Sequence, residues 1–393
     1  MAPSNRADYR GPALFSYGFR PFFLSAGVFA LIVIPLWLVI HSGHLTLGGP
    51  FAPLDWHIHE MIYGYSAAVI CGFLFTAIPN WTGRLPTRGW PLILLLTLWL
   101  AGRLAVAGVG DLPHWAAAGI DAAFLIAVVA MALVEIIAGK NWRNLKVVVP
   151  VLILLLSNIL FHVEVMVAGA SDIGQRLGIA VVVFLITLIG GRIIPSFTRN
   201  WLNKRGAAAL PTPFNRFDAI CIGAGGITLL LWASGMQNAV TSTVLLIAGI
   251  LHAARLTRWQ GHQTWRSPIL LMLHVAYGFI PLGLIALAVA APVVGLHLLG
   301  VGAIGGMTLA VMMRATMGHT GRDLTAGGLL TAAFALLITA ALIRSLAGTI
   351  TIAGLSGITL SATLWAIAFG VFVFRVGPWL LTSRVARRQP NRA

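Results

Sequence analysis

Long apolar runs, separated by short polar turns, fill almost the whole chain of 393 residues. A helix needs about 20 mostly apolar residues to cross the ~30 Å hydrocarbon core of a bilayer. Hydrophobic residues make up 59% of the chain and charged residues 9%, whereas soluble domains carry about 25% charged residues. Backbone polar groups within lipid must be satisfied inside their own segment, which a helix does. The sequence therefore predicts an all-α fold, a polytopic bundle of membrane helices.

Twelve of these runs are long enough to be membrane spans. Their approximate bounds are 19–40, 55–78, 90–109, 114–138, 146–168, 173–198, 215–234, 239–258, 268–290, 293–316, 325–346 and 352–377. The same reading divides the chain into a cytoplasmic N-terminal arm (1–18), a single transmembrane domain (19–380) and a basic cytoplasmic tail (381–393).

The net charge of +16 follows the predicted topology. All but four of the 26 basic residues lie in the arm, in the tail or in turns on one side of the bundle, and the exceptions are Arg103, Arg176, Arg192 and Arg344. Cytoplasmic loops carry such an excess of Lys and Arg. We therefore expect a multi-pass protein of the bacterial inner membrane with both termini cytoplasmic, and no nucleic-acid partner.

Histidines inside the predicted spans are the main candidates for function. Ionisable groups in a membrane are costly and mark pathways or ligands, and histidine is the commonest metal ligand. The topology sorts the metal-ligand candidates into an outer level and an inner level. The outer candidates are His57, His59, His162 and His297, and the inner candidates are His252, His274 and His319. His297 and His319 are 22 residues apart on one span, or about 33 Å, so the two levels cannot share one site.

Helical geometry separates His57 from His59. Residues two apart on a helix point to nearly opposite faces, so two ligands at these positions would serve different metals. The neighbouring Glu60 is a candidate to orient an imidazole, and Asp55 is placed to cap the start of this helix.

Two buried arginines have competing interpretations. Arg103 lies at the depth of Asp121, which favours a buried ion pair, although a guanidinium also matches a haem propionate. Arg192, in the inner half of its span, would hold a propionate or pair locally. Asn158, four residues before His162, shares its face and is expected to hydrogen-bond it.

Several segments, in this order and spacing, resemble the NnrS family of bacterial haem- and copper-containing inner-membrane proteins. They are GFRPFF (18–23), WHIHEM (56–61), PNWTG (79–83), NWRNLK (141–146), GGRIIP (190–195) and MRATMGHTGR (313–322). The resemblance covers residues 15 to 380. It implies a twelve-span protein that binds haem, expected to be b-type, and copper, and that takes part in nitric oxide metabolism, denitrification or tolerance to nitrosative stress.

The first functional hypothesis is thus a haem and copper protein that acts on nitric oxide or an iron–nitrosyl species, either by binding it or by redox turnover. Its partners are the lipid bilayer and this small molecule. The sequence shows no obvious electron donor, so it leaves open whether the protein is a catalyst. It also leaves open whether the protein forms a homo-oligomer. The alternative is a proton-coupled secondary transporter with histidines as proton-relay groups. Against it, the turn after the second span lacks the motif of major facilitator proteins, and no halfway repeat is evident. A membrane assembly or sensing factor without chemistry is a third reading.

Overall fold

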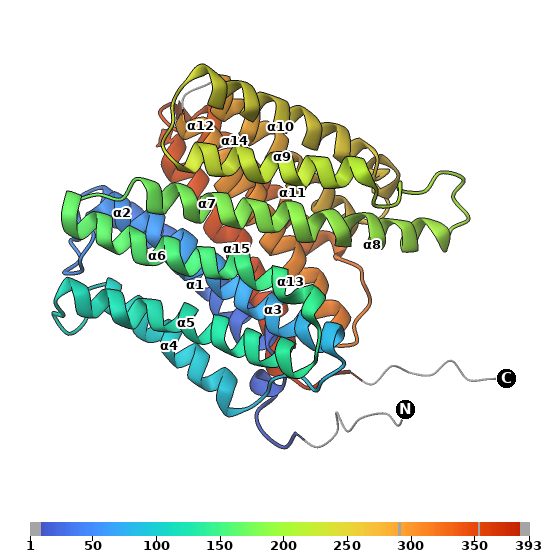
Figure 1. Ribbon diagram of the computed structural model, residues 1–393, viewed down its shortest axis with the longest axis horizontal. Coiled ribbons are helices and arrows are strands. Elements are labelled where there is room, and N and C mark those ends of the chain that lie inside the picture. Colours follow the sequence, from blue (N-terminus) through green and yellow to red (C-terminus); the bar gives the residue numbers. More distant parts are fainter. Residues whose placement is uncertain (1–8, 290–291, 353, 386–393) are drawn as a thin grey trace.

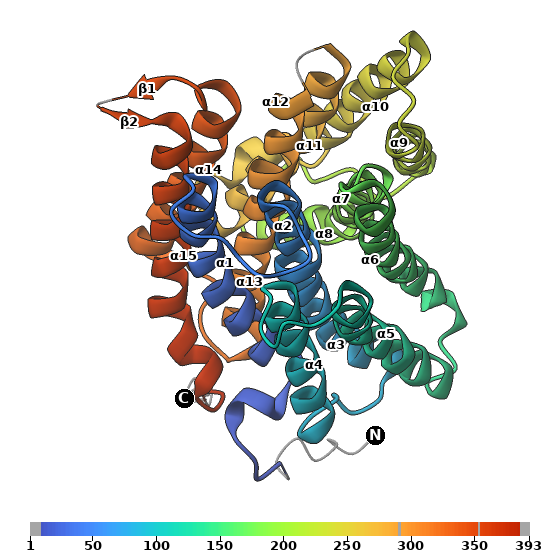
Figure 2. The same cartoon turned by 90° about the vertical axis from the view of Figure 1, so that its left-hand side faces the viewer.

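The computed structural model describes residues 9–385 apart from 290–291 and 353. Residues 1–8 of the predicted arm and 386–393 of the predicted tail lie outside the described residues. The described chain is a bundle of helices (Figure 1) with one small two-stranded hairpin (Figure 2). The all-α prediction is confirmed.

The helices of the first half are α1 (Phe19–His41), α2 (Pro53–His59), α3 (Ala67–Thr82), α4 (Trp90–Val106), α5 (His114–Ala138), α6 (Val148–Ala168), α7 (Ile173–Leu185) and α8 (Gly191–Asn203). Those of the second half are α9 (Arg216–Ala233), α10 (Ala239–Thr257), α11 (Pro268–Val289), α12 (Pro292–His297), α13 (Gly306–His319), α14 (Gly327–Leu346) and α15 (Gly357–Leu381). Strands β1 (Thr351–Ile352) and β2 (Leu355–Ser356) pair antiparallel between α14 and α15. Short 3-10 turns are η2 (Ala13–Ser16), η4 (Trp142–Val147) and η6 (Gly261–Thr264).

Each of the twelve predicted spans corresponds to a helix of the described chain. Eleven continuous helices are long and apolar enough to cross a membrane, and Trp90–Val106 is a shorter apolar helix at the third predicted position. The second span begins earlier than predicted, with Pro53 in its first turn. Asp55 therefore lies inside the helix, where it accepts a hydrogen bond from the Ser171 backbone N–H (3.2 Å), and the predicted cap is wrong.

The first and last spans meet at one end of the bundle. The Arg20 guanidinium, in the first turn of α1, donates to the carbonyls of Leu380 (2.8 Å) and Thr382 (2.7 Å) at the end of α15. Figure 2 shows α1 and α15 side by side, and the two helices are in contact along the bundle. We call this the termini end and the other the opposite end. An even number of crossings explains why both helices meet there.

Three spans contain a widened, π-helical stretch. These stretches are η3 (Glu60–Ser66) between α2 and α3, η5 (Ile186–Gly190) between α7 and α8, and η7 (Leu298–Gly305) between α12 and α13. A π-bulge interrupts the regular i to i−4 hydrogen bonding and is frequent at functional sites. Glu60, the first residue of η3, contacts the imidazole of the buried His59.

Candidate metal centre

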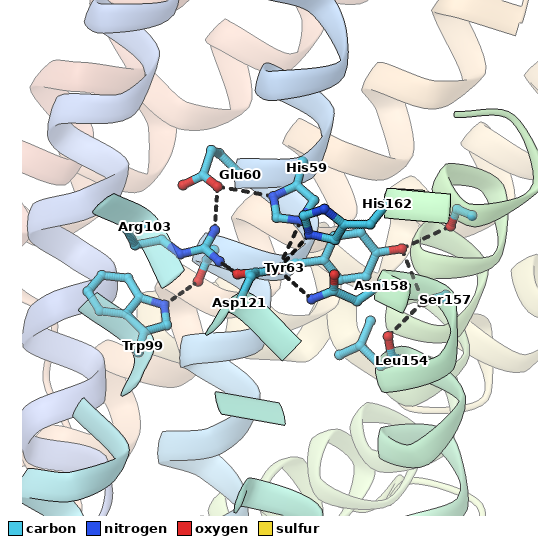
Figure 3. A network of polar contacts seen from close by, with 12 residues as sticks. His59, Glu60, Tyr63, Trp99, Arg103, Asp121, Leu154, Ser157, Asn158 and His162 are labelled. Atoms are coloured by element: carbon cyan, nitrogen blue, oxygen red, sulfur yellow. Dashed lines mark hydrogen bonds and ion pairs between the residues drawn. The ribbon is translucent and has the colours of Figure 1, made fainter. Parts of the chain in front are cut away.

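His59, Asp121 and His162 come together from three helices near the opposite end. One ligand atom of each side chain lies within 4.8 Å of the ligand atoms of the other two. The carboxylate Oδ2 of Asp121 is 3.2 Å from Nε2 of His59 and 3.2 Å from Nε2 of His162. All three side chains are buried (Figure 3). Two imidazoles and a carboxylate are a ligand set that suits a transition-metal ion.

A buried arginine joins this group to a second carboxylate. The guanidinium of Arg103 donates to Oε1 of Glu60 through Nη1 and to Oδ1 of Asp121 through Nη2. The predicted ion pair between Arg103 and Asp121 is thus confirmed, and Glu60 is an additional partner. Glu60 also lies 3.1 Å from Nδ1 of His59, the orienting contact that its position beside the histidine predicts.

The charges of the buried group do not balance. Glu60 and Asp121 bring two negative charges and Arg103 brings one positive charge, so with neutral imidazoles the group has one excess negative charge. The imidazole of His59 lies between both carboxylates, which places the strongest attraction for a cation at its two nitrogens. Buried charge without compensation is costly, so the group favours uptake of a cation, either a proton or a metal ion.

Two glycines let the charged side chains approach each other. A Cβ at position 64 would lie 2.8 Å from Nη1 of Arg103 and 3.1 Å from Oε2 of Glu60. A Cβ at position 102 would lie 2.8 Å from Oδ1 of Asp121. In addition, the Trp99 indole donates to the carbonyl of Gly64 (2.9 Å), which fixes α4 against η3. The sequence around Gly64 and Gly102 thus sets the geometry of the ion pairs.

An aromatic ring from the segment between α1 and α2 covers the imidazoles. The buried ring of Phe51 lies 4.7 Å from the ring of His59, 4.9 Å from that of His162 and 5.6 Å from that of His114. His114, the first residue of α5, is half-buried, and its Nε2 lies 3.3 Å from Nδ1 of His162. Neither Phe51 nor His114 was among the candidates from the sequence.

The remaining outer candidates lie elsewhere. The ring of His57 stacks on Trp37 (4.6 Å between centroids, 13° between planes), and its buried Nδ1 has no hydrogen-bond partner among the described residues. His297 donates from Nδ1 to the Val293 carbonyl (2.8 Å). The prediction that His57 and His59 face different surroundings is confirmed, and the outer level divides into two groups.

The inner histidines do not form a common site. His252 Nδ1 lies 2.8 Å from the Tyr277 hydroxyl, which also lies 3.0 Å from Nη1 of Arg255. Because a guanidinium can only donate, the hydroxyl accepts from Arg255, and it shares a second hydrogen bond with Nδ1 of His252. The same guanidinium donates to Asp218 Oδ1 from Nε (2.9 Å) and to the Thr187 carbonyl (2.9 Å). This cluster therefore occupies Nδ1 of His252.

His274 and His319 have separate surroundings. His274 donates from Nδ1 to the Leu270 carbonyl (2.9 Å), with Nε2 3.4 Å from the Thr198 hydroxyl. The ring of His319 lies 5.4 Å from the rings of both Tyr17 and Phe19. Among the described residues, only His59, Asp121 and His162 satisfy the distance criterion for a metal-ligand group.

Two predictions about polar neighbours need comment. Asn158 does lie beside His162, but its amide donates to Asp121 Oδ2 (2.8 Å), so the predicted bond to His162 is wrong. The acidic side chain is the stronger acceptor in this interior. Arg192 is exposed on α8 and is not paired with a carboxylate of the described residues.

Comparison with protein families gives one result over nearly the full chain. A family model described as NnrS protein matches residues 13–384. A search of curated proteins finds no match.

Proposed function

The chain belongs to the NnrS family, a family of membrane proteins connected with nitric oxide, and on that premise we propose that His59, His162 and Asp121 hold a copper ion. In this proposal the protein acts on nitric oxide or an iron–nitrosyl species, by binding or by redox turnover, in the bacterial inner membrane with its termini end in the cytoplasm. Copper held by these three residues would supply one-electron chemistry and bind a small ligand such as nitric oxide.

The buried excess of negative charge is the observation that carries the proposal. Glu60 and Asp121 outnumber Arg103 by one charge, and His59 lies between the two acids at 3.1 and 3.2 Å. A bound cation would remove the excess charge. The donor set of two histidines and one carboxylate fits copper and other transition ions better than calcium or magnesium, which take oxygen ligands.

The residues around the three ligands have distinct roles in this arrangement. Glu60 accepts from His59 and Arg103 holds Asp121, so both ligands are fixed from behind. His114 contacts the far nitrogen of His162 and sets the orientation of its ring. Phe51 covers the imidazoles and limits access of water. Second partners of this kind tune the affinity of metal ligands.

For haem, the chain offers histidine nitrogens that would bind the iron, but it gives weaker support for a pocket that would hold the macrocycle. His297 and His274 each donate Nδ1–H to the carbonyl four residues earlier, which leaves the Nε2 lone pair available, as in metal-ligating histidines. An apolar pocket between α3, α6 and α13 has no histidine in its lining. Haem, expected to be b-type, therefore remains a proposal that rests on the family resemblance, with His297 and His274 as its axial candidates.

Metal content and the visible spectrum of the purified protein test the proposal. We expect one copper ion per chain, lost in His59→Ala, His162→Ala and Asp121→Asn. His262→Ala, which removes an exposed histidine away from the site, is the matched control and should keep its copper. A wild-type protein that binds neither copper nor haem would reject the proposal and favour the transporter, in which the same histidines relay protons.

A further inference from the structure

An apolar pocket opens on the side of the bundle between α3, α6, η5 and α13. It lies between side chains of these helices and is partly open to the surface. Its wall is almost entirely apolar and includes Ile70, Phe73, Val151, Val182 and Val311. Ile70, Phe73 and Val311 are half-buried, so the pocket reaches the surface that would contact lipid.

The pocket lies in the half of the bundle toward the termini end. Val147 and Val151, in its wall, lie at the start of the α6 span, where the chain enters from the termini end. The wall residues of α3 end at Leu74, next to Phe75, and a Cβ at position 18, just before α1, would lie 2.5 Å from Cβ of Phe75. The pocket is therefore separate from the His59 group, which lies near the opposite end.

An unpaired arginine lies at the termini-side edge of this pocket. Arg314 is one turn beyond the wall residue Val311 on α13, and its guanidinium carbon lies 3.9 Å from the ring of Phe197. Phe197 is one turn beyond the wall residue Ile193 on α8, so the pair bridges two walls of the pocket. Arg314 is half-buried and forms no ion pair with any carboxylate among the described residues. A cation at this depth is costly without an anion.

Two further cations stand next to wall residues in the sequence. Arg192 precedes the wall residue Ile193, and Lys146 precedes the wall residue Val147. Both side chains are exposed, and neither is paired with a carboxylate of the described chain. Three positive charges from three elements thus lie beside an apolar pocket that opens to the side. Basic pockets between membrane helices bind anionic lipid headgroups.

We propose that this pocket binds an anionic phospholipid, with an acyl chain in the apolar pocket and the phosphate held by Arg314, Arg192 and Lys146. The apolar wall matches the chain, and the three unpaired cations match the headgroup. Haem also combines an apolar body with anionic groups, but the wall offers no histidine, cysteine or tyrosine as a ligand for its iron, and its one sulfur donor is the thioether of Met307. The lipid is therefore the better match.

Lipid binding to the delipidated full-length protein tests this proposal. Native mass spectrometry would compare phosphatidylglycerol with phosphatidylcholine of the same acyl chains. We expect wild type to prefer phosphatidylglycerol, and each base changed to glutamine to weaken that binding about fivefold, or about 100-fold in the triple variant Lys146→Gln, Arg192→Gln, Arg314→Gln. Arg143→Gln, an exposed base on the same short helix as Lys146, is the matched control and should bind as wild type.

A pocket-filling variant tests the site of the acyl chain. Val311→Phe keeps all three bases and should lose the bound phosphatidylglycerol, which a purely electrostatic surface effect would not explain. If the triple variant does not fold, the exposed Arg192→Gln alone should still show the fivefold loss. Equal binding of both lipids to wild type, or an unchanged preference in Arg192→Gln, would overturn the proposal. A loss of haem rather than lipid in these variants would assign the pocket to haem and overturn it as well.

Discussion

Two buried polar clusters lie in opposite halves of the bundle and use the same kinds of side chain. Each has an arginine, an acid, a histidine and a nearby tyrosine. In the first, Arg103 faces two carboxylates, those of Glu60 and Asp121. In the second, Arg255 faces only Asp218. The first cluster has excess negative charge, whereas the buried charges of the second balance.

The second cluster also has a cation in reserve. Arg258, partly exposed, lies 3.6 Å from Asp218, so any imbalance there is positive. In addition, the Tyr277 hydroxyl occupies Nδ1 of His252, whereas both nitrogens of His59 face carboxylates. A buried histidine in these membrane helices is thus a metal-ligand candidate where the charges around it are unbalanced, and a structural group where they balance.

Replacing the arginine of each cluster should give the largest difference in stability between the two. Arg103→Met leaves two buried carboxylates without their cation, which should cost about 3–5 kcal/mol. Arg255→Met leaves one carboxylate with Arg258 nearby and should cost less. The midpoint of thermal unfolding in detergent measures both.

The double variant Arg103→Met, Glu60→Gln controls for lost packing. It has the same net charge as wild type and should recover much of the stability that Arg103→Met loses. No recovery would show that packing of Arg103, rather than charge, stabilises this cluster.

Neutralising Glu60 should weaken copper binding even though Glu60 is outside the ligand group. Glu60→Gln removes the excess negative charge and replaces the charged acceptor for His59 Nδ1 by a weaker, neutral amide oxygen, so we expect an affinity for copper about 10–100-fold lower. Copper titration against a competing chelator measures this change. Asp218→Asn, the matching change in the second cluster, should leave the copper affinity unaltered, and an equal loss there would contradict the charge argument.

His114 should have a smaller effect because it acts through His162. His114→Ala removes the contact at 3.3 Å from Nδ1 of His162 and should lower the copper affinity about tenfold. His44→Ala removes an exposed histidine whose contact is Ser42 and is the control. A loss as complete as in His162→Ala would make His114 a direct ligand instead.

The smallest expected effect lies in the second cluster. Tyr277→Phe removes the hydroxyl between His252 and Arg255, but Arg255 keeps its bonds to Asp218 and Thr187. We expect a loss of about 1 kcal/mol in stability and no change in copper content. Lower copper content in this variant would place metal at the inner cluster and remove the distinction between the two.

The sequence predicts the helices that carry the site better than it predicts the contacts within the site. The lengths of the apolar runs predict the helix at each of the twelve span positions. Equal depth in the membrane predicts the ion pair between Arg103 and Asp121. Spacing on a helix correctly separates His57 from His59. These features depend on distance along a helix, which the sequence gives directly.

Contacts between distant segments are harder to predict. Phe51 covers the imidazoles from a connecting segment with no periodicity, and Asp121 is a ligand candidate only because α5 packs against α6 in one particular rotation. The spacing of four residues predicts a hydrogen bond between Asn158 and His162. It does not reveal Asp121, the stronger acceptor on the neighbouring helix α5. The close approach allowed by Gly64 likewise depends on how α4 packs.

X-ray absorption spectroscopy of the copper-loaded protein tests the central claim most directly. It should show copper bound by two imidazole nitrogens and an oxygen in wild type and in His252→Ala, whereas His162→Ala should retain no copper at this site. An unchanged copper environment in a variant that lacks both His59 and His162, or a sulfur ligand in wild type, would contradict the assignment of the metal to the cluster with excess negative charge.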